Sequence, residues 1–260
     1  MRLRDKLVLI NVLGIVIAAL AIFICAYLIS TRTMEATLMA SLKEKMGNVQ
    51  RKVEAEKKRY EGISYLVASR PDLIAATKAK NIPLLQSICK DIWEKTGVNM
   101  LTLSDMSGAV LARGHSTQTG DSVLNQSIVQ SCMKGIPSSG IEEGSRVKYT
   151  IRAGHPVMDQ GQVIGTVTSG MNLSEDRFVD EIKKEQGVEC TIFQGDTRVS
   201  TTIIVNGNRA MGTKMTNQKV LDTVLTAGGM FEAEIELLGG KYFTVYWPIR
   251  DPQGKITGMF

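Results

Sequence analysis

From Leu7 to Ser30 the sequence has no charged residue and consists mainly of Leu, Val, Ile, Ala and Phe. At a rise of about 1.5 Å per residue, a helix of this length crosses a hydrocarbon core of roughly 30 Å. The basic residues Arg2, Arg4 and Lys6 precede the run, and positive charge before a span keeps the amino terminus in the cytoplasm. We therefore expect a cytoplasmic segment over residues 1–6, a transmembrane helix over residues 7–30 and an extracytoplasmic remainder.

A cleaved secretory signal is the main alternative to a retained membrane anchor. The apolar run is longer than a usual signal core, and no clear small-x-small cleavage site follows it. Cys25 follows Ile24, where a lipoprotein site needs a small residue. A buried soluble helix of this length is also disfavoured, so the retained anchor is the preferred interpretation.

The charge and cysteine patterns exclude several classes of function. The net charge is +5, but basic and acidic residues are interleaved, so we expect no nucleic-acid partner. The four cysteines form no CxxC pair, so no metal site and no cofactor are expected. Cys89 and Cys132 are compatible with either a disulfide or buried free thiols. The chain has two histidines and no Ser/His/Asp or Cys/His constellation, so no enzyme activity is expected.

A long amphipathic helix is predicted to follow the span over residues 33–67. Charged residues of both signs separate its apolar positions, which indicates a solvated face opposite a packing face. The apolar positions are Met34, Leu38, Leu42, Met46, Val49, Val53, Tyr60, Ile63 and Leu66. Their spacing of three and four residues suits packing against a partner helix within the domain or in a second subunit.

After a break at Pro71, a shorter helix is predicted to end near Gly97, and from there the apolar period changes to two. Strands are predicted over residues 98–104 and 109–113, a helix over 122–134, and strands over 147–158 and 162–171. A similar order follows: a helix capped by Ser174 and ending near Gln186, strands over 188–193 and 198–204, a helix over 217–226, and strands over 230–238 and 241–249. A last strand begins after residues 251–254 and is cut off at Phe260.

The fold class predicted from this order is α+β, with antiparallel sheets in two PAS-like modules. The long helix and a membrane-distal module occupy residues 31–172. A membrane-proximal module with an incomplete last strand occupies residues 173–260.

Four ordered segments resemble the double-Cache sensor regions of bacterial methyl-accepting chemotaxis proteins, specifically the Cache_3-Cache_2 fusion type. They are Asp105–Asn125 (DMSGAVLARGHSTQTGDSVLN), Ser139–Val157 (SGIEEGSRVKYTIRAGHPV), Glu189–Lys214 (ECTIFQGDTRVSTTIIVNGNRAMGTK) and Gly240–Met259 (GKYFTVYWPIRDPQGKITGM). The resemblance implies two Cache modules, small-molecule recognition and homodimers in the membrane. It also implies a second span, a HAMP linker and a cytoplasmic helical hairpin, so the chain is expected to be a fragment or a truncated receptor.

Basic residues in the first module are the candidate ligand-binding residues. Arg113 and His115 follow the second predicted strand, and arginine binds carboxylate bidentately. In the related single-Cache sensors for citrate and four-carbon dicarboxylates, an Arg/His pair in this hairpin and a later Arg hold the carboxylates. The resemblance therefore implies Arg152 as the later arginine, although the Arg-to-His spacing is shorter here and His155 stands where those sensors have Thr.

Tyr149 and His155 are further candidates on the same strand as Arg152. Strand alternation places them on the face opposite Arg152, and we expect a bulge at Gly154 to reconcile the two faces. Arg146, beside Glu142 and Glu143, is interpreted as a solvent-exposed ion-pair partner.

The sequence thus predicts the extracytoplasmic sensor of a chemoreceptor that binds a small, anionic organic acid and transmits a conformational signal across the bacterial inner membrane. One alternative is the sensor of a histidine kinase or diguanylate cyclase. Alternatives from other classes are a membrane-tethered enzyme and a structural dimerisation module.

Overall fold

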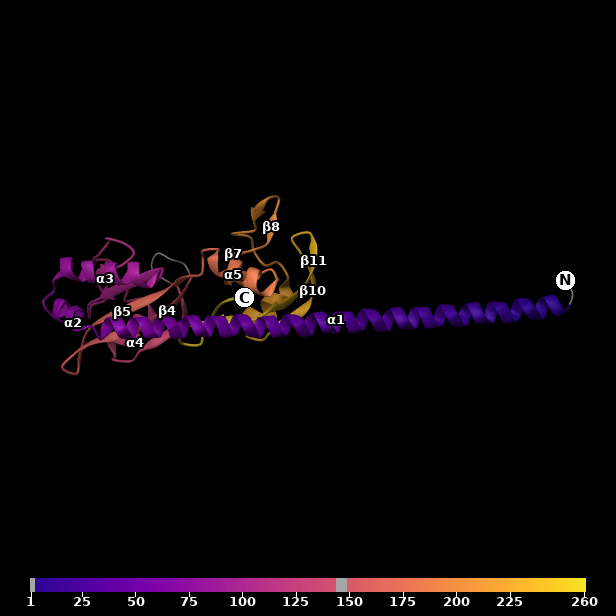
Figure 1. The fold of residues 1–260 in the computed structure, drawn as a ribbon, viewed down its shortest axis with the longest axis horizontal. Coiled ribbons are helices and arrows are strands. Elements are labelled where there is room, and N and C mark those ends of the chain that lie inside the picture. Colours follow the sequence, from indigo (N-terminus) through magenta and orange to yellow (C-terminus); the bar gives the residue numbers. More distant parts are fainter. Residues whose placement is uncertain (1–2, 144–148) are drawn as a thin grey trace. The chain divides into compact units, whose positions relative to one another are not determined.

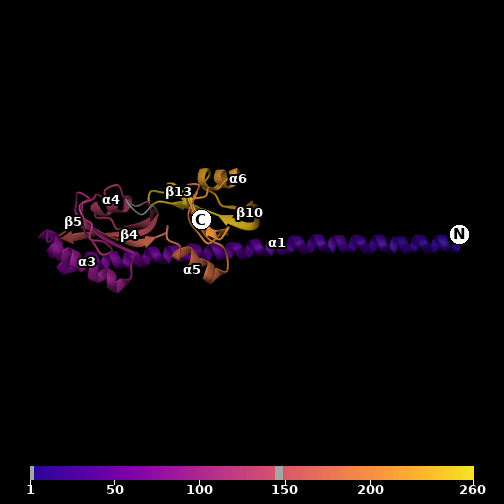
Figure 2. The same ribbon diagram turned by 90° about the horizontal axis from the view of Figure 1, so that it is seen from above.

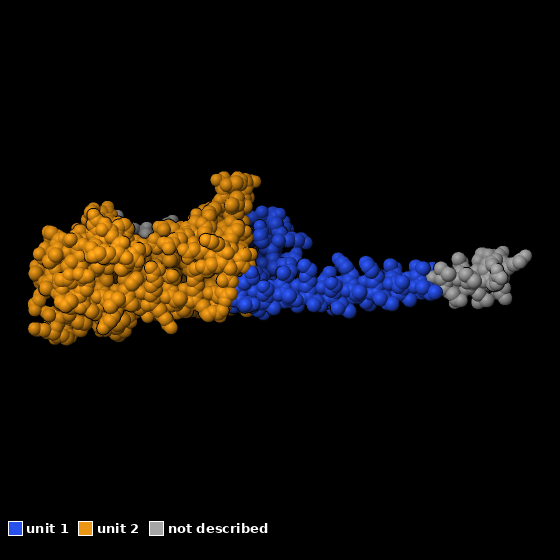
Figure 3. Space-filling view, in the orientation of Figure 1, with its two compact units in different colours: residues 1–46, 232–244 blue, residues 47–231, 245–260 orange. Residues whose placement is uncertain are grey.

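A computed structural model describes the backbone of residues 3–143 and 149–260, with side chains from residue 13 onward (Figure 1). Arg146 and the first residues of the strand predicted over 147–158 lie outside the described residues, as do the side chains of the predicted cytoplasmic segment 1–6. The chain divides into two compact units (Figure 3), residues 1–46 with 232–244 and residues 47–231 with 245–260. We describe each unit separately.

The first unit contains the apolar part of helix α1, which runs from Leu3 to Ala68. From Leu13 onward this helix has an 18-residue window of mean hydropathy 2.7, none of which is buried. By length and composition it fits a single membrane span. The same unit holds most of a hairpin of β10 (Phe231–Leu237) and β11 (Gly240–Tyr246). Lys43 of α1 forms an ion pair with Glu232 of β10 at 2.8 Å.

The second unit contains a five-stranded antiparallel sheet of order β2-β1-β5-β4-β3. Its strands are β1 (Met100–Ser104), β2 (Val110–Arg113), β3 (Ser138–Glu142), β4 (Thr150–Asp159) and β5 (Gln162–Asn172). The predicted strands are confirmed where they are described, whereas β3 is missed by the sequence pattern because Ser138, Ser139 and Gly140 give it no apolar alternation.

The two faces of this sheet are covered differently. On one face, Ser64 of α1 donates a hydrogen bond to the Ala153 carbonyl at 3.0 Å, and its hydroxyl lies 2.9 Å from that of Ser169. The opposite face carries α4 (Ser127–Met133), which contacts β3, β4 and β5. Figure 2 shows α4 and the end of α1 on opposite sides of β4 and β5. We call these the α1 face and the α4 face.

Most of the core lies on the α1 face. Its largest fully buried apolar side chains include Tyr60, Leu73, Leu85, Leu101, Leu103 and Ile151. The stripe predicted for the long helix is confirmed at Val49, Val53 and Tyr60 but is wrong at Leu66, which is 67% exposed while Val67 is buried. Both positions fit a helical period, and only packing decides which one faces the sheet.

Two shorter helices complete this face, α2 (Pro71–Lys78) and α3 (Ile82–Thr96). The side chain of Asn81 caps α3 by accepting the Leu84 N–H at 3.2 Å. Gly97 ends α3 in the left-handed region with φ 64°, where glycine carries no steric cost. The predicted end of this helix is therefore confirmed, and α2 is an additional helix after the break at Pro71.

A second sheet has the order β12-β13-β6-β7. Its strands are β6 (Thr191–Gln194), β7 (Thr197–Thr201), β12 (Pro248–Arg250) and β13 (Ile256–Met259), and a small hairpin of β8 (Ile204–Val205) and β9 (Asn208–Arg209) follows β7. The predicted helix over 217–226 is α6 (Gln218–Val220) continued by the π-helix η1 (Leu221–Thr226).

Helix α5 (Arg177–Gln186) precedes this sheet and begins later than predicted. Its N-cap is Asp176, and the hydroxyl of Ser174 is buried without a hydrogen-bond partner among the described residues, so the predicted Ser174 cap is wrong. The chain from Leu173 to Asp176 forms a turn held by Asn172, whose side chain accepts the Ser174 N–H at 2.9 Å. The α+β fold class is confirmed.

All four cysteines are free, so Cys89 and Cys132 correspond to the free-thiol alternative. Burial raises the pKa of each of these two thiols to about 12, which keeps both protonated at neutral pH. They pack as small apolar side chains.

Candidate functional site

The register of the first sheet places Arg113 and Arg152 on the α4 face. Arg113 lies opposite Thr102, Thr102 opposite Thr168, and Thr168 opposite Gly154. Cross-strand partners point to the same side, and Arg152 precedes Gly154 by two residues, so its side chain shares that side. The backbones of β2 and β4 are separated by three strand spacings, about 14 Å.

Arg113 is held by a carboxylate within its own hairpin. Its Nη1 and Nη2 donate to Oδ1 and Oδ2 of Asp121 at 2.7 and 2.8 Å, and Nη1 also donates to the Gln118 carbonyl at 2.8 Å. The residue is 5% exposed. The Nη1–Nη2 edge of the Arg113 guanidinium group is therefore occupied by a carboxylate of its own hairpin.

Helix α3 positions the loop that carries Arg113 and His115. The side-chain amide of Gln86 donates to the carbonyls of Arg113 and Ser116 and accepts the Arg113 N–H. A Cβ at Gly114 would lie 2.4 Å from Cβ of Trp93, so only glycine allows α3 to approach this closely.

His115 lies in the electrostatic field of both arginines. Its Nδ1 accepts the Leu101 N–H at 3.2 Å, which leaves Nε2–H as the donor of a neutral ring. Burial lowers the pKa of His115, and the charges of Arg113 and Arg152 lower it further. The sheet register thus places Arg113 and Arg152 on one face of the first sheet, and His115 lies in the loop that follows β2.

Arg152 forms a buried ion pair with Glu142 of β3. Its Nη1 donates to Oε1 of Glu142 at 2.7 Å, and the two side chains are 8% and 5% exposed. The other carboxylate oxygen of Glu142 accepts from the Ser127 hydroxyl at 2.7 Å and from the Ile128 N–H at 3.3 Å. This network joins β4, β3 and the first turn of α4.

The structure does not bring Tyr149 and His155 together with the arginines. The hydroxyl of Tyr149 lies 2.6 Å from Oγ1 of Thr257 next to the second sheet, and burial raises its pKa. His155 packs edge-on against Tyr65 of α1 at a centroid distance of 5.1 Å, on the α1 face. The predicted bulge at Gly154 is wrong, because pairing is regular there and the irregularity lies between Val157 and Met158.

Gly154 instead allows α4 to pack on the sheet. A Cβ at this position would lie 2.7 Å from Cγ2 of Ile128 and 2.8 Å from Sγ of Cys132. The helix therefore closes directly over the strand that carries Arg152.

Sequence reasoning missed the acidic partners Asp121 and Glu142. The sequence pattern places Glu142 beside Arg146, which is interpreted as a solvent-exposed ion-pair partner, whereas Glu142 itself is 4% exposed. Asp121 directly follows Gly120, which ends the loop after His115, and this position is a signal that could have identified it. Nothing in the sequence connects Glu142 to Arg152 before β3 is known.

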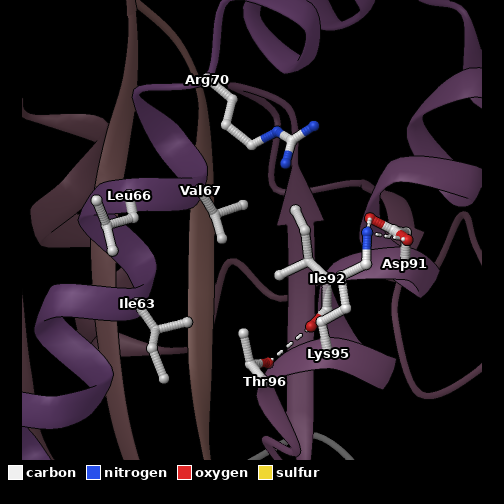
Figure 4. A pocket seen from close by; sticks show the side chains of 8 residues that line it. All are labelled: Ile63, Leu66, Val67, Arg70, Asp91, Ile92, Lys95 and Thr96. Carbon is white, nitrogen blue, oxygen red and sulfur yellow. Dashed lines mark hydrogen bonds and ion pairs between the residues drawn. The ribbon is translucent and has the colours of Figure 1, made fainter.

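A pocket of 380 Å³ lies between the end of α1 and α3 (Figure 4). Its lining includes the apolar residues Ile63, Val67 and Ile92 and the charged residues Arg70, Asp91 and Lys95. Arg113, His115 and Arg152 are not among its lining residues.

Acidification is expected to destabilise the protein through His115. Because the folded pKa lies below the unfolded value of about 6.5, the unfolded state binds more protons, and stability is lost as pH falls below about 6.5. In His115→Gln this contribution disappears. Denaturant unfolding of the parent protein and of His115→Gln at pH 5.5, 7.5 and 8.5 measures this contribution. The difference in unfolding free energy between the two proteins should change between pH 7.5 and 5.5. It should stay constant from pH 7.5 to 8.5. A difference independent of pH throughout would contradict this assignment.

Comparisons with known proteins agree with this fold. Residues 170–260 match the family model described as Single cache domain 3. No curated protein sequence matches the chain.

Solved structures of sensor domains are similar over most of the chain. The sensor domain of the Vibrio cholerae histidine kinase DctB has a TM-score of 0.59 and 12% identity, covering 86% of this chain and 96% of that domain. The ligand-binding domain of the Campylobacter jejuni chemoreceptor Tlp3 in complex with 4-methylisoleucine has a TM-score of 0.55 and 14% identity, covering 84% of this chain and 86% of that one. The same domain in complex with L-valine has a TM-score of 0.52 and 15% identity, covering 84% of this chain and 88% of that one. The fold is that of Cache, PAS-like sensor domains.

Proposed function

We propose that this chain is the double-Cache sensing region of a bacterial transmembrane chemoreceptor, and that the α4 face of its first sheet binds a small metabolite that carries a carboxylate. The observation that supports the proposal is the placement of Arg113 and Arg152 on one face of that sheet, with His115 in the loop after β2. A candidate membrane span in the same chain supports an extracytoplasmic sensor anchored in the inner membrane.

Two features support a double-Cache arrangement with modules over residues 31–172 and 173–260. The Single cache domain 3 match covers the second of these regions. The first region has its own five-stranded antiparallel sheet. The exposed Met34 and Leu38 of α1, at 65% and 39%, suit contact with a second copy in a membrane dimer.

The charges at the site bear on the class of ligand. Asp121 and Glu142 each neutralise one arginine, and His115 is neutral at pH 7, so the site as a whole is close to neutral. A dianion would be repelled by the carboxylates of Asp121 and Glu142. A zwitterion instead offers a carboxylate to an arginine and an ammonium group to an acid. An amino acid is therefore a second candidate beside the organic acid, and the Tlp3 domain was solved with such ligands.

Signal transmission is proposed to pass from the first sheet to the second. The Tyr149–Thr257 hydroxyl pair at 2.6 Å joins them, and a Cβ at Gly140 would lie 2.7 Å from Cγ of Pro252, which shows how closely the two pack. Ligand binding that favours one arrangement of these contacts by about 1 to 3 kcal/mol would bias a two-state receptor. A histidine kinase or diguanylate cyclase output is an alternative use of the same sensor.

Removing the Arg113 charge is expected to weaken ligand binding about 10- to 100-fold, because a charge-assisted contact to the ligand carboxylate is lost. The variant is Arg113→Gln with Asp121→Asn, so that no buried carboxylate is left unpaired. Isothermal titration of the purified full chain with a panel of carboxylates and amino acids measures it. Lys90→Gln, a change at a 64%-exposed side chain, is the matched control and should bind as the parent does.

Two analogues separate the ligand classes once an amino acid binds. L-Valinamide lacks the carboxylate, and N-acetyl-L-valine lacks the ammonium group. Loss of binding by both supports the zwitterion, whereas tight binding by the acetylated compound supports the anion. Unchanged affinity in the double variant would remove Arg113 from the site.

A further inference from the structure

Arg198 is a buried cation in the second sheet. It lies on the edge strand β7, opposite Phe193 of β6, and is 1% exposed. Its guanidinium carbon lies 4.8 Å from the Phe193 ring centroid. Nη1 donates to Oγ1 of Thr213 at 2.8 Å, and the Lys214 carbonyl lies 3.4 Å away.

Among the described residues, no carboxylate pairs with Arg198. The nearby acid Asp196 pairs with Lys214 at 2.9 Å, and Asp176 pairs with Arg209 at 3.2 Å. Burial lowers the pKa of Arg198, which reflects the cost of enclosing its charge. The buried Arg113 and Arg152 differ in this respect, since each has an acidic partner.

The unpaired atoms of Arg198 form one edge of the guanidinium group. Nε and Nη2 are both buried without a hydrogen-bond partner in the described chain, while Nη1 is occupied. The N–H bonds of Nε and Nη2 on this edge are parallel, which is the geometry that accepts the two oxygens of a carboxylate. A buried donor left unpaired destabilises a fold, and here two such donors share one cation.

One aromatic ring contacts this cation, and two more continue from it in a chain of ring contacts. Phe193 stacks on the guanidinium group, Tyr246 lies 6.3 Å from Phe193 between ring centroids, and Phe231 lies 6.4 Å from Tyr246. Burial raises the pKa of Tyr246 to about 12, so its hydroxyl stays protonated as a donor. Such surroundings suit a ligand with one carboxylate and a short apolar body.

We infer that the second sheet holds its own binding site for a small monocarboxylate, with the Nε–Nη2 edge of Arg198 as the anchor. The site is separate from the α4 face of the first sheet and does not depend on the function proposed for that face. Because the edge is enclosed, the ligand enters when the segment 210–215, hydrogen-bonded to Arg198 through Gly212 and Thr213, moves away from β7.

The test is thermal unfolding of the full chain in detergent with formate, acetate, propionate, lactate and pyruvate. All proteins carry Arg113→Gln and Asp121→Asn, so that the first site does not contribute. A carboxylate at about 100 times its Kd is expected to raise the Tm by about 5 to 10 °C.

Two variants decide the role of Arg198. Arg198→Met removes the unpaired charge and keeps a similar side-chain volume. It should therefore abolish the rise in Tm on adding carboxylate and raise the Tm of the ligand-free protein. Arg198→Lys keeps the charge but loses the fork, so the Kd should rise at least about 10-fold.

Three outcomes would overturn the inference. The first is a carboxylate-induced rise in Tm that persists in Arg198→Met. The second is a lower ligand-free Tm in Arg198→Met, together with no carboxylate-induced rise in the protein that carries only Arg113→Gln and Asp121→Asn. The third is a rise in Tm with inorganic phosphate that exceeds the rise with every carboxylate.

Discussion

Replacing Glu142 by glutamine is expected to lower the free energy of unfolding by about 3 to 5 kcal/mol, because it leaves the buried Arg152 without a counterion. The Glu142 carboxylate also accepts from Ser127 and Ile128, and a neutral amide oxygen serves these donors less well. Urea denaturation followed by circular dichroism measures the loss.

The double variant Glu142→Gln with Arg152→Met is the repair experiment. Removing both charges should recover most of the stability, since an ion pair in a buried site can be replaced by apolar packing at little cost. Glu94→Gln is the control, because its ion pair with Lys90 is exposed and should contribute less than about 0.5 kcal/mol. Equal effects of Glu142→Gln and Glu94→Gln would show that the pair is not buried in solution.

The double variant also informs the functional proposal. If Arg152 contacts the ligand, Glu142→Gln with Arg152→Met folds but binds weakly. Retained stability with unchanged affinity would assign Arg152 a structural role alone.

Alanine at Gly258 is expected to destabilise the second sheet by about 3 kcal/mol or more. Its Cβ would lie 1.9 Å from the Phe193 carbonyl oxygen and 3.0 Å from the Tyr149 hydroxyl. The clash with backbone forces β13 away from β6, where Gly258 pairs with Gln194. The measurement is the Tm together with the near-ultraviolet circular dichroism of Trp247, which stacks on Phe260 at 5.3 Å.

Gly62→Ala is the matched control for this substitution. Gly62 lies within α1, and no atom of the described residues outside the helix backbone lies within 4 Å of an added Cβ, so alanine there should stabilise the protein by about 0.5 to 1 kcal/mol. A neutral result at Gly258 would mean that β13 does not pair closely with β6.

Much of the fold could be predicted because its elements depend on local signals. The charge-free run, the three-to-four spacing of Val49, Val53 and Tyr60, and the turn residues at 105–108 and 159–161 each act within a few residues. The strand β3 and the side of α1 that faces the sheet could not be predicted in this way. Both are decided by which distant segment supplies the partner surface, as the exposed Leu66 beside the buried Val67 shows.

The apolar helix, the α+β order of elements and the arginines worth testing can be predicted from local sequence, because periodicity, turn chemistry and charge depend on neighbouring residues. Which acid neutralises which arginine depends on the three-dimensional fold, which pairs Arg113 with Asp121 and Arg152 with Glu142 and leaves Arg198 without an acid among the described residues. Ion pairing in a buried site depends on distances between side chains, and these distances are set by sheet register and helix packing rather than by separation along the sequence.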